Sequence, residues 1–211
     1  MSKVIVDSNS ASIRKAFAFA WMTFRQHAGL FTASMLTFFA AWVILEVIVV
    51  KGQRFGFFLW AVAHLSFFFV FAVMEMGFIR ICLACHAGKP IHYSDLFREV
   101  YPGIHFLFVQ LVYFVMILVG FVLLVVPGIY LGVKYALYAF HFANGSSDLK
   151  QSFQQSAVTG HDSWWFLFWF SVLMLLLNIL GASILGVGLL LTVPLSVLMK
   201  TSVYRQLRGE L

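Results

Sequence analysis

The sequence predicts an all-α integral membrane protein with six transmembrane helices. Of its 211 residues, 62% are hydrophobic and only 10% are charged. Soluble domains are about 45–50% apolar and about 25% charged, so the composition excludes a soluble fold. Apolar runs recur along the chain, and most of them have the roughly 20 residues that a helix needs to cross a hydrocarbon core. The polar segments between them are too short for a separate soluble domain.

The chain is expected to begin with a cytoplasmic or interfacial amphipathic segment, residues 1–28. From Ile13 onward, apolar residues recur at the spacing of one helix face, with basic residues mostly away from them. This pattern is typical of a helix that lies in the headgroup plane, with Trp21 as an interfacial anchor. Lipid sensing and a simple lead-in to the first span both remain open for this segment.

Residues 29–207 are expected to form a single six-span membrane domain. The predicted spans are residues 29–50, 55–87, 102–126, 127–143, 164–181 and 183–203. The spans pair into three helical hairpins, each preceded by an amphipathic lead-in. Helix breaks are expected at Pro127-Gly128, between the third and fourth spans, and at Pro194, because proline removes a backbone N–H and kinks a helix.

The distribution of basic residues predicts the orientation. Six spans put both termini on one side of the membrane. That side holds eleven Lys and Arg residues: Lys3, Arg14, Lys15, Arg25, Arg80, Lys89, Arg98, Lys150, Lys200, Arg205 and Arg208. The opposite side holds only Lys51 and Arg54. The positive-inside rule therefore predicts cytoplasmic termini. It also explains the formal charge of +6, so no nucleic-acid partner is expected.

Four stretches of the chain resemble a known family. They are residues 77–88 leading to Ser94-Asp95-Leu96-Phe97, residues 126–130 (VPGIY), residues 151–160, and residues 186–194 followed by Tyr204-Arg205. In this order they are similar to the bacterial six-span family that includes the membrane domain of some glycerophosphodiester phosphodiesterases. The resemblance covers residues 65–207. It implies a fold and a bacterial inner-membrane location, but no catalytic residues, because this chain lacks the soluble phosphodiesterase domain.

An ionisable residue inside the second span is the main candidate for a site. Glu75 lies near the bilayer centre, where a charge costs several kcal/mol unless it is paired or hydrated. Lys134 is its expected partner, because helical rise places both residues at a similar depth. The polar cluster expected around this pair comprises Glu75, Lys134, Tyr130, Tyr138, His141 and His64. A structural ion pair and a polar intramembrane cavity are both consistent with the pattern.

A second cluster formally matches a haem-attachment motif. Cys82, Cys85 and His86 have C-x-x-C-H spacing. Haem of this kind is attached outside the cytoplasm, whereas the charge distribution places these residues at a cytoplasmic helix end. They remain weak metal candidates, and no cofactor and no metal are expected.

The sequence contains no Ser/His/Asp arrangement, HExxH helix or phosphate-binding loop, so no enzyme activity is expected. Two functions are left open. The first is a non-enzymatic inner-membrane scaffold or accessory protein that meets lipid or a partner through its amphipathic segments. The second is a small transporter or lipid-handling protein that uses a cavity around Glu75 and Lys134. Membrane lipids are the expected partners, with a membrane protein or a second copy of the chain left open.

Overall fold

The computed structural model describes residues 11–52, 56–98, 100–145, 148–184 and 186–209, and all its elements are helices. In chain order they are α1 (Ile13–Gln26), α2 (Ala28–Gly52), α3 (Phe57–His86), the 3-10 helix η3 (Tyr93–Phe97), α4 (Val100–Leu123), α5 (Val125–Lys134), α6 (Tyr138–Ala143), α7 (Leu149–Asp162), α8 (Trp164–Ser183) and α9 (Leu189–Leu207). The all-α prediction is confirmed. Residues 1–10 of the predicted leading segment lie outside the described part.

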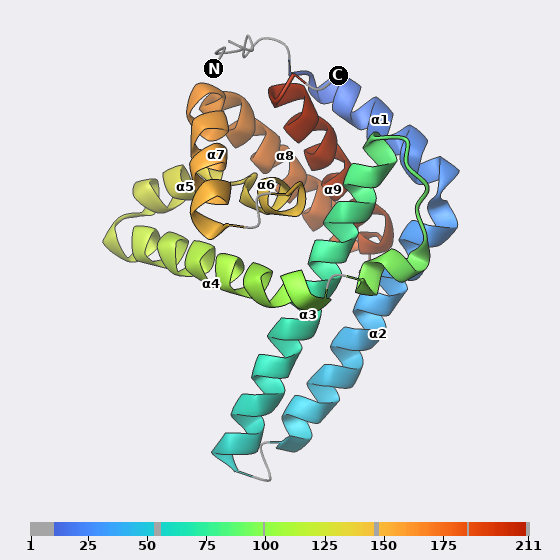
Figure 1. The fold of residues 1–211 in the computed structure, drawn as a ribbon, viewed down its shortest axis with the longest axis vertical. Helices are drawn as coiled ribbons and strands as arrows, with labels where there is room; N and C mark the ends of the chain where they lie inside the picture. The colour runs from blue at the N-terminus through green and yellow to red at the C-terminus, as the bar shows by residue number, and fades with distance from the viewer. Residues whose placement is uncertain (1–10, 53–55, 99, 146–147, 185, 210–211) are drawn as a thin grey trace.

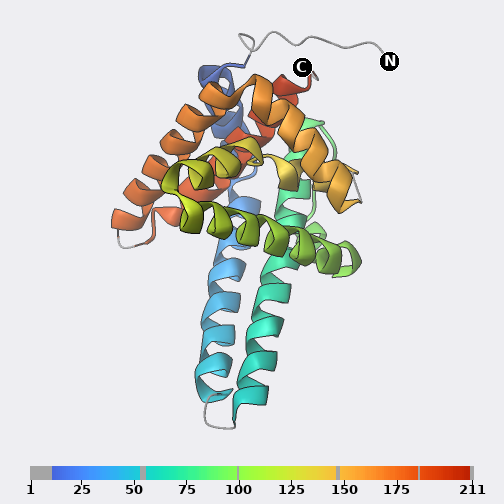
Figure 2. The same ribbon diagram turned by 90° about the vertical axis from the view of Figure 1, so that its left-hand side faces the viewer.

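Helices α2 and α3 form an antiparallel hairpin that projects away from the other helices (Figure 1). With 30 residues, α3 is about 45 Å long at the usual helical rise. Helix α4 runs across this hairpin rather than along it, as Figures 1 and 2 both show. The spans are therefore not arranged as a parallel bundle.

Four described helical segments are long and apolar enough to cross a membrane. They are Ala28–Lys51, Phe57–His86, Pro102–Leu123 and Trp164–Ser183. The predicted fourth span, residues 127–143, is instead divided between α5 and α6, which have 10 and 6 residues and are each too short to cross a bilayer. Helix α9 is long enough, but Lys200 and Arg205 lower its hydropathy.

Helix α9 lies at the centre of the protein, where it contacts α1, α2, α3 and α8. Its buried residues include Leu198, Met199 and Tyr204, and also the polar Gln206. The polar groups of α9 are thus turned toward protein, which explains why a helix of modest hydropathy occupies this position.

The helices do not break at the predicted prolines. The turn between α4 and α5 is at Leu124, which is extended (φ −165°, ψ 148°), so Pro127 falls in the first turn of α5, where a missing N–H costs little. Gly128 lies within α5 and lets it approach α4, because a Cβ on Gly120 would be 2.8 Å from the Gly128 Cα. Helix α9 continues through Pro194 without interruption. The chain does break between the third and fourth predicted spans, but at Leu124, three residues before Pro127. Helix α9 has no break at Pro194, and a kink there stays a prediction.

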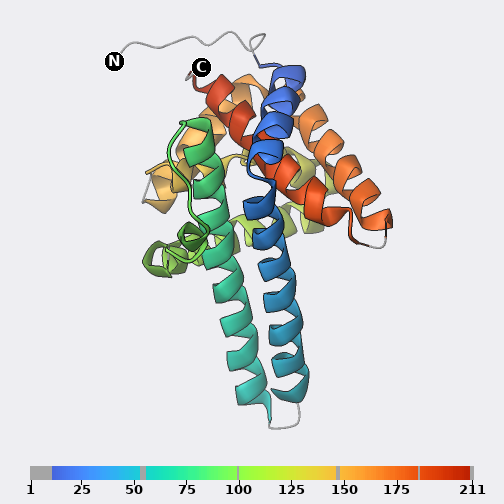
Figure 3. The same ribbon diagram turned by 90° about the vertical axis from the view of Figure 1, so that its right-hand side faces the viewer.

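Helix α1 is present at the predicted residues and packs on α9 (Figure 3). The Ser12 side chain caps its first turn, and the Ser12 N–H donates to Gln206 Oε1 at 2.7 Å. Ala16 and Ala20 are completely buried, whereas Trp21 is exposed. The small residues of α1 thus face protein, whereas Phe17, Trp21 and Met22 are left for the surroundings. Its place in the headgroup plane remains a prediction.

A close contact between η3 and α3 gives a test of the fold. A Cβ on Gly77 would lie 2.2 Å from the Leu96 carbonyl oxygen, and backbone cannot move aside cheaply. Gly77→Ala is expected to lower the stability of the protein by about 1–3 kcal/mol, the usual cost of overpacking. Thermal unfolding in detergent measures this. Gly29→Ala is the control, because no atom lies within 4 Å of its Cβ position; equal effects of the two variants would contradict the contact.

Candidate functional site

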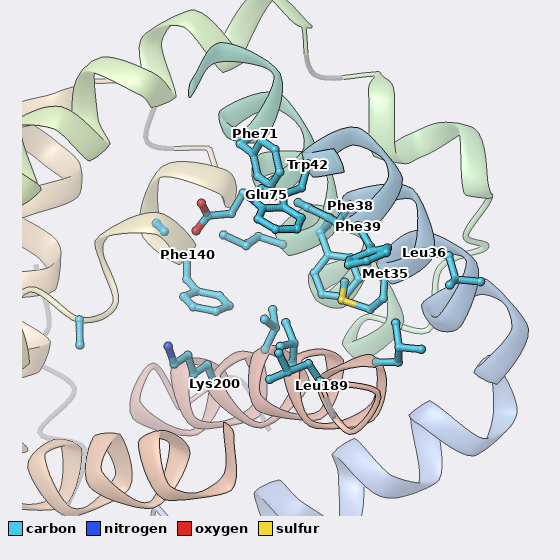
Figure 4. A pocket seen from close by; sticks show the side chains of 18 of the residues that line it. Met35, Leu36, Phe38, Phe39, Trp42, Phe71, Glu75, Phe140, Leu189 and Lys200 are labelled. Carbon is cyan, nitrogen blue, oxygen red and sulfur yellow. The ribbon is translucent and has the colours of Figure 1, made fainter. Parts of the chain in front are cut away.

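A cavity of about 790 Å³ lies between the α2–α3 hairpin and helices α6 and α9 (Figure 4). We call it the central cavity. Its lining includes side chains from residues 35–42 of α2, 71–79 of α3, 138–140 of α6 and 189–200 of α9. Tyr113, Ala136 and residues 186–187, just before α9, complete the lining. Most of the lining side chains are aliphatic or aromatic, so the cavity suits an apolar ligand.

Glu75 and Lys200 are the charged residues of the lining. Figure 4 shows the Glu75 carboxylate and the Lys200 ammonium on opposite sides of the cavity, both toward its Phe140 end. Glu75 is exposed to the cavity although its neighbours Met74 and Met76 are buried in the core. Helix α3 therefore presents the Glu75 carboxylate to the cavity.

The Glu75 carboxylate is held by a neutral donor. Gln110 Nε2, from α4, donates a hydrogen bond to Glu75 Oε2. Gln110 reaches this position because α4 packs on α3. The positive charge of Lys200 acts on Glu75 across the cavity, yet no ion pair joins these two described residues. In a medium of low dielectric constant, two opposite charges held apart make a strong local field.

Two tyrosines, one from α4 and one from α6, line the central cavity. The ring centroids of Tyr113 and Tyr138 are 4.4 Å apart, and Tyr138 also stacks on Phe153 at 5.5 Å. The Tyr113 hydroxyl donates to the Gly132 carbonyl at 3.0 Å. These contacts fix the orientation of both rings, so this wall of the cavity is preformed.

The expected pair of Glu75 and Lys134 is not formed. Lys134 does not line the central cavity; its Nζ lies 5.6 Å from the ring centroid of Tyr130 and 5.7 Å from that of Tyr135. These are cation–π distances. The prediction treated residues 127–143 as one helix, whereas residues 135–137 separate α5 from α6 and change the direction of the side chains. Of the expected partners, Tyr138 is the one that lines the cavity with Glu75.

The two predicted histidines lie elsewhere. His141 is buried, with Nδ1 3.1 Å from Gln155 Oε1 and its ring against Tyr204. His64 Nδ1 is 3.1 Å from the Trp60 carbonyl oxygen, one turn earlier on α3. Neither residue lines the central cavity, so the polar cluster predicted around Glu75 and Lys134 does not include them as one site.

The Cys-x-x-Cys-His stretch lies at the end of α3. Cys82 is buried, Cys85 is half-buried, and both are free thiols. The His86 ring lies 4.5 Å from that of Phe19. The described residues include no group of three or more His, Cys, Asp or Glu side chains arranged to hold a metal ion. The His86 ring thus gives α3 a contact with α1.

A buried hydroxyl joins the ends of α6 and α9. Tyr204 is completely buried, and its oxygen accepts hydrogen bonds from Asn144 Nδ2 at 3.2 Å and from Arg208 Nη1 at 2.5 Å. The ring of Tyr204 also packs on Phe140, which lines the central cavity. Tyr204 thus supports the cavity wall from behind.

Tyr204→Phe is expected to lower the free energy of unfolding by about 0.5–1.5 kcal/mol, the net value of a typical hydrogen bond, because both donors are at the surface and can turn to water. Thermal unfolding of the purified protein measures this. The matched control is Tyr135→Phe, since the Tyr135 hydroxyl makes no hydrogen bond within the described part of the chain. An effect no larger than that of the control would contradict a supporting role.

Comparisons with models of known families, with curated proteins and with solved structures find no match to this chain. A function must therefore be argued from the central cavity itself.

Proposed function

We propose that this protein binds a lipid or a lipid-like amphiphile in the central cavity and so acts in lipid handling or transport. The observation that carries the proposal is the lining, which is apolar except for Glu75, Lys200 and tyrosine hydroxyls. The volume of about 790 Å³ is in the range of ligand sites, about 300–1,000 Å³. An amphiphile would place its apolar part along the aromatic walls and its polar head at the charged end.

The exposed residues of α2 at the edge of the cavity support the idea that a ligand enters from the membrane. Leu36, Phe39 and Trp42 line the cavity, and they are 51%, 60% and 46% exposed. Helix α2 is one of the four segments able to cross a membrane, so its exposed apolar residues would contact hydrocarbon. A ligand would then enter sideways from the lipid.

A scaffold or accessory role, the other hypothesis from the sequence, requires no cavity. A preformed cavity with two charges inside it favours binding of a small molecule, because burying charge is costly unless it has a use. We therefore place the scaffold role second and propose binding without catalysis.

We further propose that the long helices form three hairpins, α2–α3, α4–α5 and α8–α9, with both termini in the cytoplasm of a bacterium, as the family resemblance also implies. The described ends of the chain support a common side, because the N- and C-terminal regions lie together at the end opposite the α2–α3 tip (Figures 1 and 3). In the sequence, basic residues are concentrated on that side. Antiparallel pairs such as α4–α5 and α8–α9 return the chain to the side from which it came.

The proposed function is tested by identifying what the purified protein retains. The protein is extracted from its native membranes with a mild detergent, and bound small molecules are measured by mass spectrometry. We expect about one amphiphile per chain in the wild type. Val193→Trp fills the cavity from α9 and is expected to remove most of it.

Val158→Trp is the matched control, because Val158 is 66% exposed on α7 and does not line the cavity. This variant should retain the ligand. Equal amounts of amphiphile in both variants, or none in the folded wild type, would overturn the proposed function.

A further inference from the structure

We propose that the ligand of the central cavity carries a zwitterionic head, with an ammonium group at Glu75 and an acidic group such as a phosphodiester at Lys200. A lipid that carries both an ammonium group and a phosphodiester is an aminophospholipid. This inference rests on the proposed function, because it names the class of ligand for the same cavity.

Charge balance is the first argument. Glu75 and Lys200 together make the cavity electrically neutral. A ligand with a net charge would leave one unbalanced charge in a region of low dielectric constant, and an uncharged ligand would strip water from both groups without replacing it. A zwitterion matches both charges at once.

The hydrogen-bonding capacity of the two groups is the second argument. Gln110 donates to Glu75 Oε2, and no described residue donates to Oε1. The Lys200 ammonium has three donors and makes no hydrogen bond to the described side chains or carbonyls. One carboxylate oxygen can thus receive a ligand ammonium, while the Lys200 donors can bind phosphate oxygens in charge-assisted hydrogen bonds.

The aromatic lining is the third argument. In Figure 4 the Phe140 ring lies between the Glu75 and Lys200 side chains, and Phe71 lies beside Glu75. Aromatic faces attract an ammonium group. Beyond the charged pair, side chains such as Phe39 and Leu190 give the cavity an apolar part that can accept acyl chains.

The inference predicts a preference among lipids that differ only in the head. Phosphatidylethanolamine and phosphatidylglycerol with identical acyl chains share the phosphodiester, but the second lacks the ammonium. Delipidated protein in nanodiscs containing equal amounts of both is re-extracted, and the retained lipids are counted by native mass spectrometry. We expect phosphatidylethanolamine to be retained about tenfold over phosphatidylglycerol. Glycerophosphoethanolamine, which has the same head without acyl chains, should not be retained and shows whether the head alone suffices.

Variants test the two charges separately. Glu75→Gln is expected to abolish the preference, because an amide cannot neutralise an ammonium. Lys200→Gln is expected to lower the retention of both phospholipids. Lys134→Gln is the matched control, because Lys134 lies outside the cavity, and it should leave retention and preference unchanged.

The outcomes separate the two proposals. Equal retention of both phospholipids by the wild type, lost in Val193→Trp, would overturn the zwitterionic head while leaving the proposed function intact. Strong retention of glycerophosphoethanolamine would show that the ligand is a soluble zwitterion and would overturn the proposal that it is a lipid. Retention of no amphiphile by the folded wild type would overturn the proposed function itself. The wild-type comparison is decisive even where a variant does not fold.

Discussion

Lys200→Met is expected to destabilise the protein more than the double variant Glu75→Gln/Lys200→Met. Lys200 faces the Glu75 carboxylate across the central cavity, so its removal leaves a carboxylate without a balancing charge. An ionisable group at the centre of a span costs about 2.5–3.5 kcal/mol, and the Gln110 hydrogen bond offsets part of this. We expect a loss of about 2 kcal/mol in the single variant, with most of it restored in the double variant.

Thermal unfolding in one detergent, with delipidated samples, measures this coupling without interference from ligand. The control is Lys134→Met, alone and combined with Glu75→Gln. Because Lys134 contacts Tyr130 and Tyr135 and does not line the cavity, its effect should add to that of Glu75→Gln. Simple additivity for the Lys200 pair as well would show that the two charges do not interact.

Ala16→Glu on α1 is expected to have the largest effect of any single substitution proposed. Ala16 is completely buried where α1 packs on α9. A carboxylate there would be an uncompensated buried charge, which costs about 3–5 kcal/mol. We therefore expect a large fall in the yield of folded protein, measured by fluorescence-detected size-exclusion chromatography.

Ala18→Glu is the matched control, since Ala18 is exposed on the same helix and the substitution adds the same charge. It should leave the yield nearly unchanged. If both variants behaved alike, α1 would be a peripheral segment that lies on the membrane, and its packing on α9 would not contribute to stability.

The sequence predicted the helices better than their arrangement. The runs that became α2, α3 and α8 were visible because a long apolar stretch has few structural alternatives. The division of residues 127–143 was not predicted. Hydropathy gives residues 135–137 the same apolar average as the helices beside them. The sequence therefore does not reveal the turn there, after which α6 packs against α3 and α7.

The assignment of the partner of Glu75 failed for the same reason. Measuring depth from helix ends assumes helices that run parallel, and α4 and its successors do not follow the α2–α3 hairpin. Gln110 and Lys200 carried a usable signal, because both are polar side chains inside predicted spans. Lys200 was counted among the cytoplasmic residues, although the apolar stretch Val193–Met199 precedes it. Which polar groups inside spans meet is decided by tertiary packing.

The proposed entry of a ligand beside the exposed Leu36 and Trp42 also determines how the occupancy of the central cavity should be expressed. A site filled from the hydrocarbon equilibrates with the mole fraction of its ligand in the surrounding leaflet and not with an aqueous concentration. On the mole-fraction scale, about 4 kcal/mol of binding free energy is a factor of about a thousand, so an abundant lipid would keep such a site filled with this modest affinity. Changes in bilayer composition would then alter occupancy directly, and a scarce lipid would compete only through its charged head.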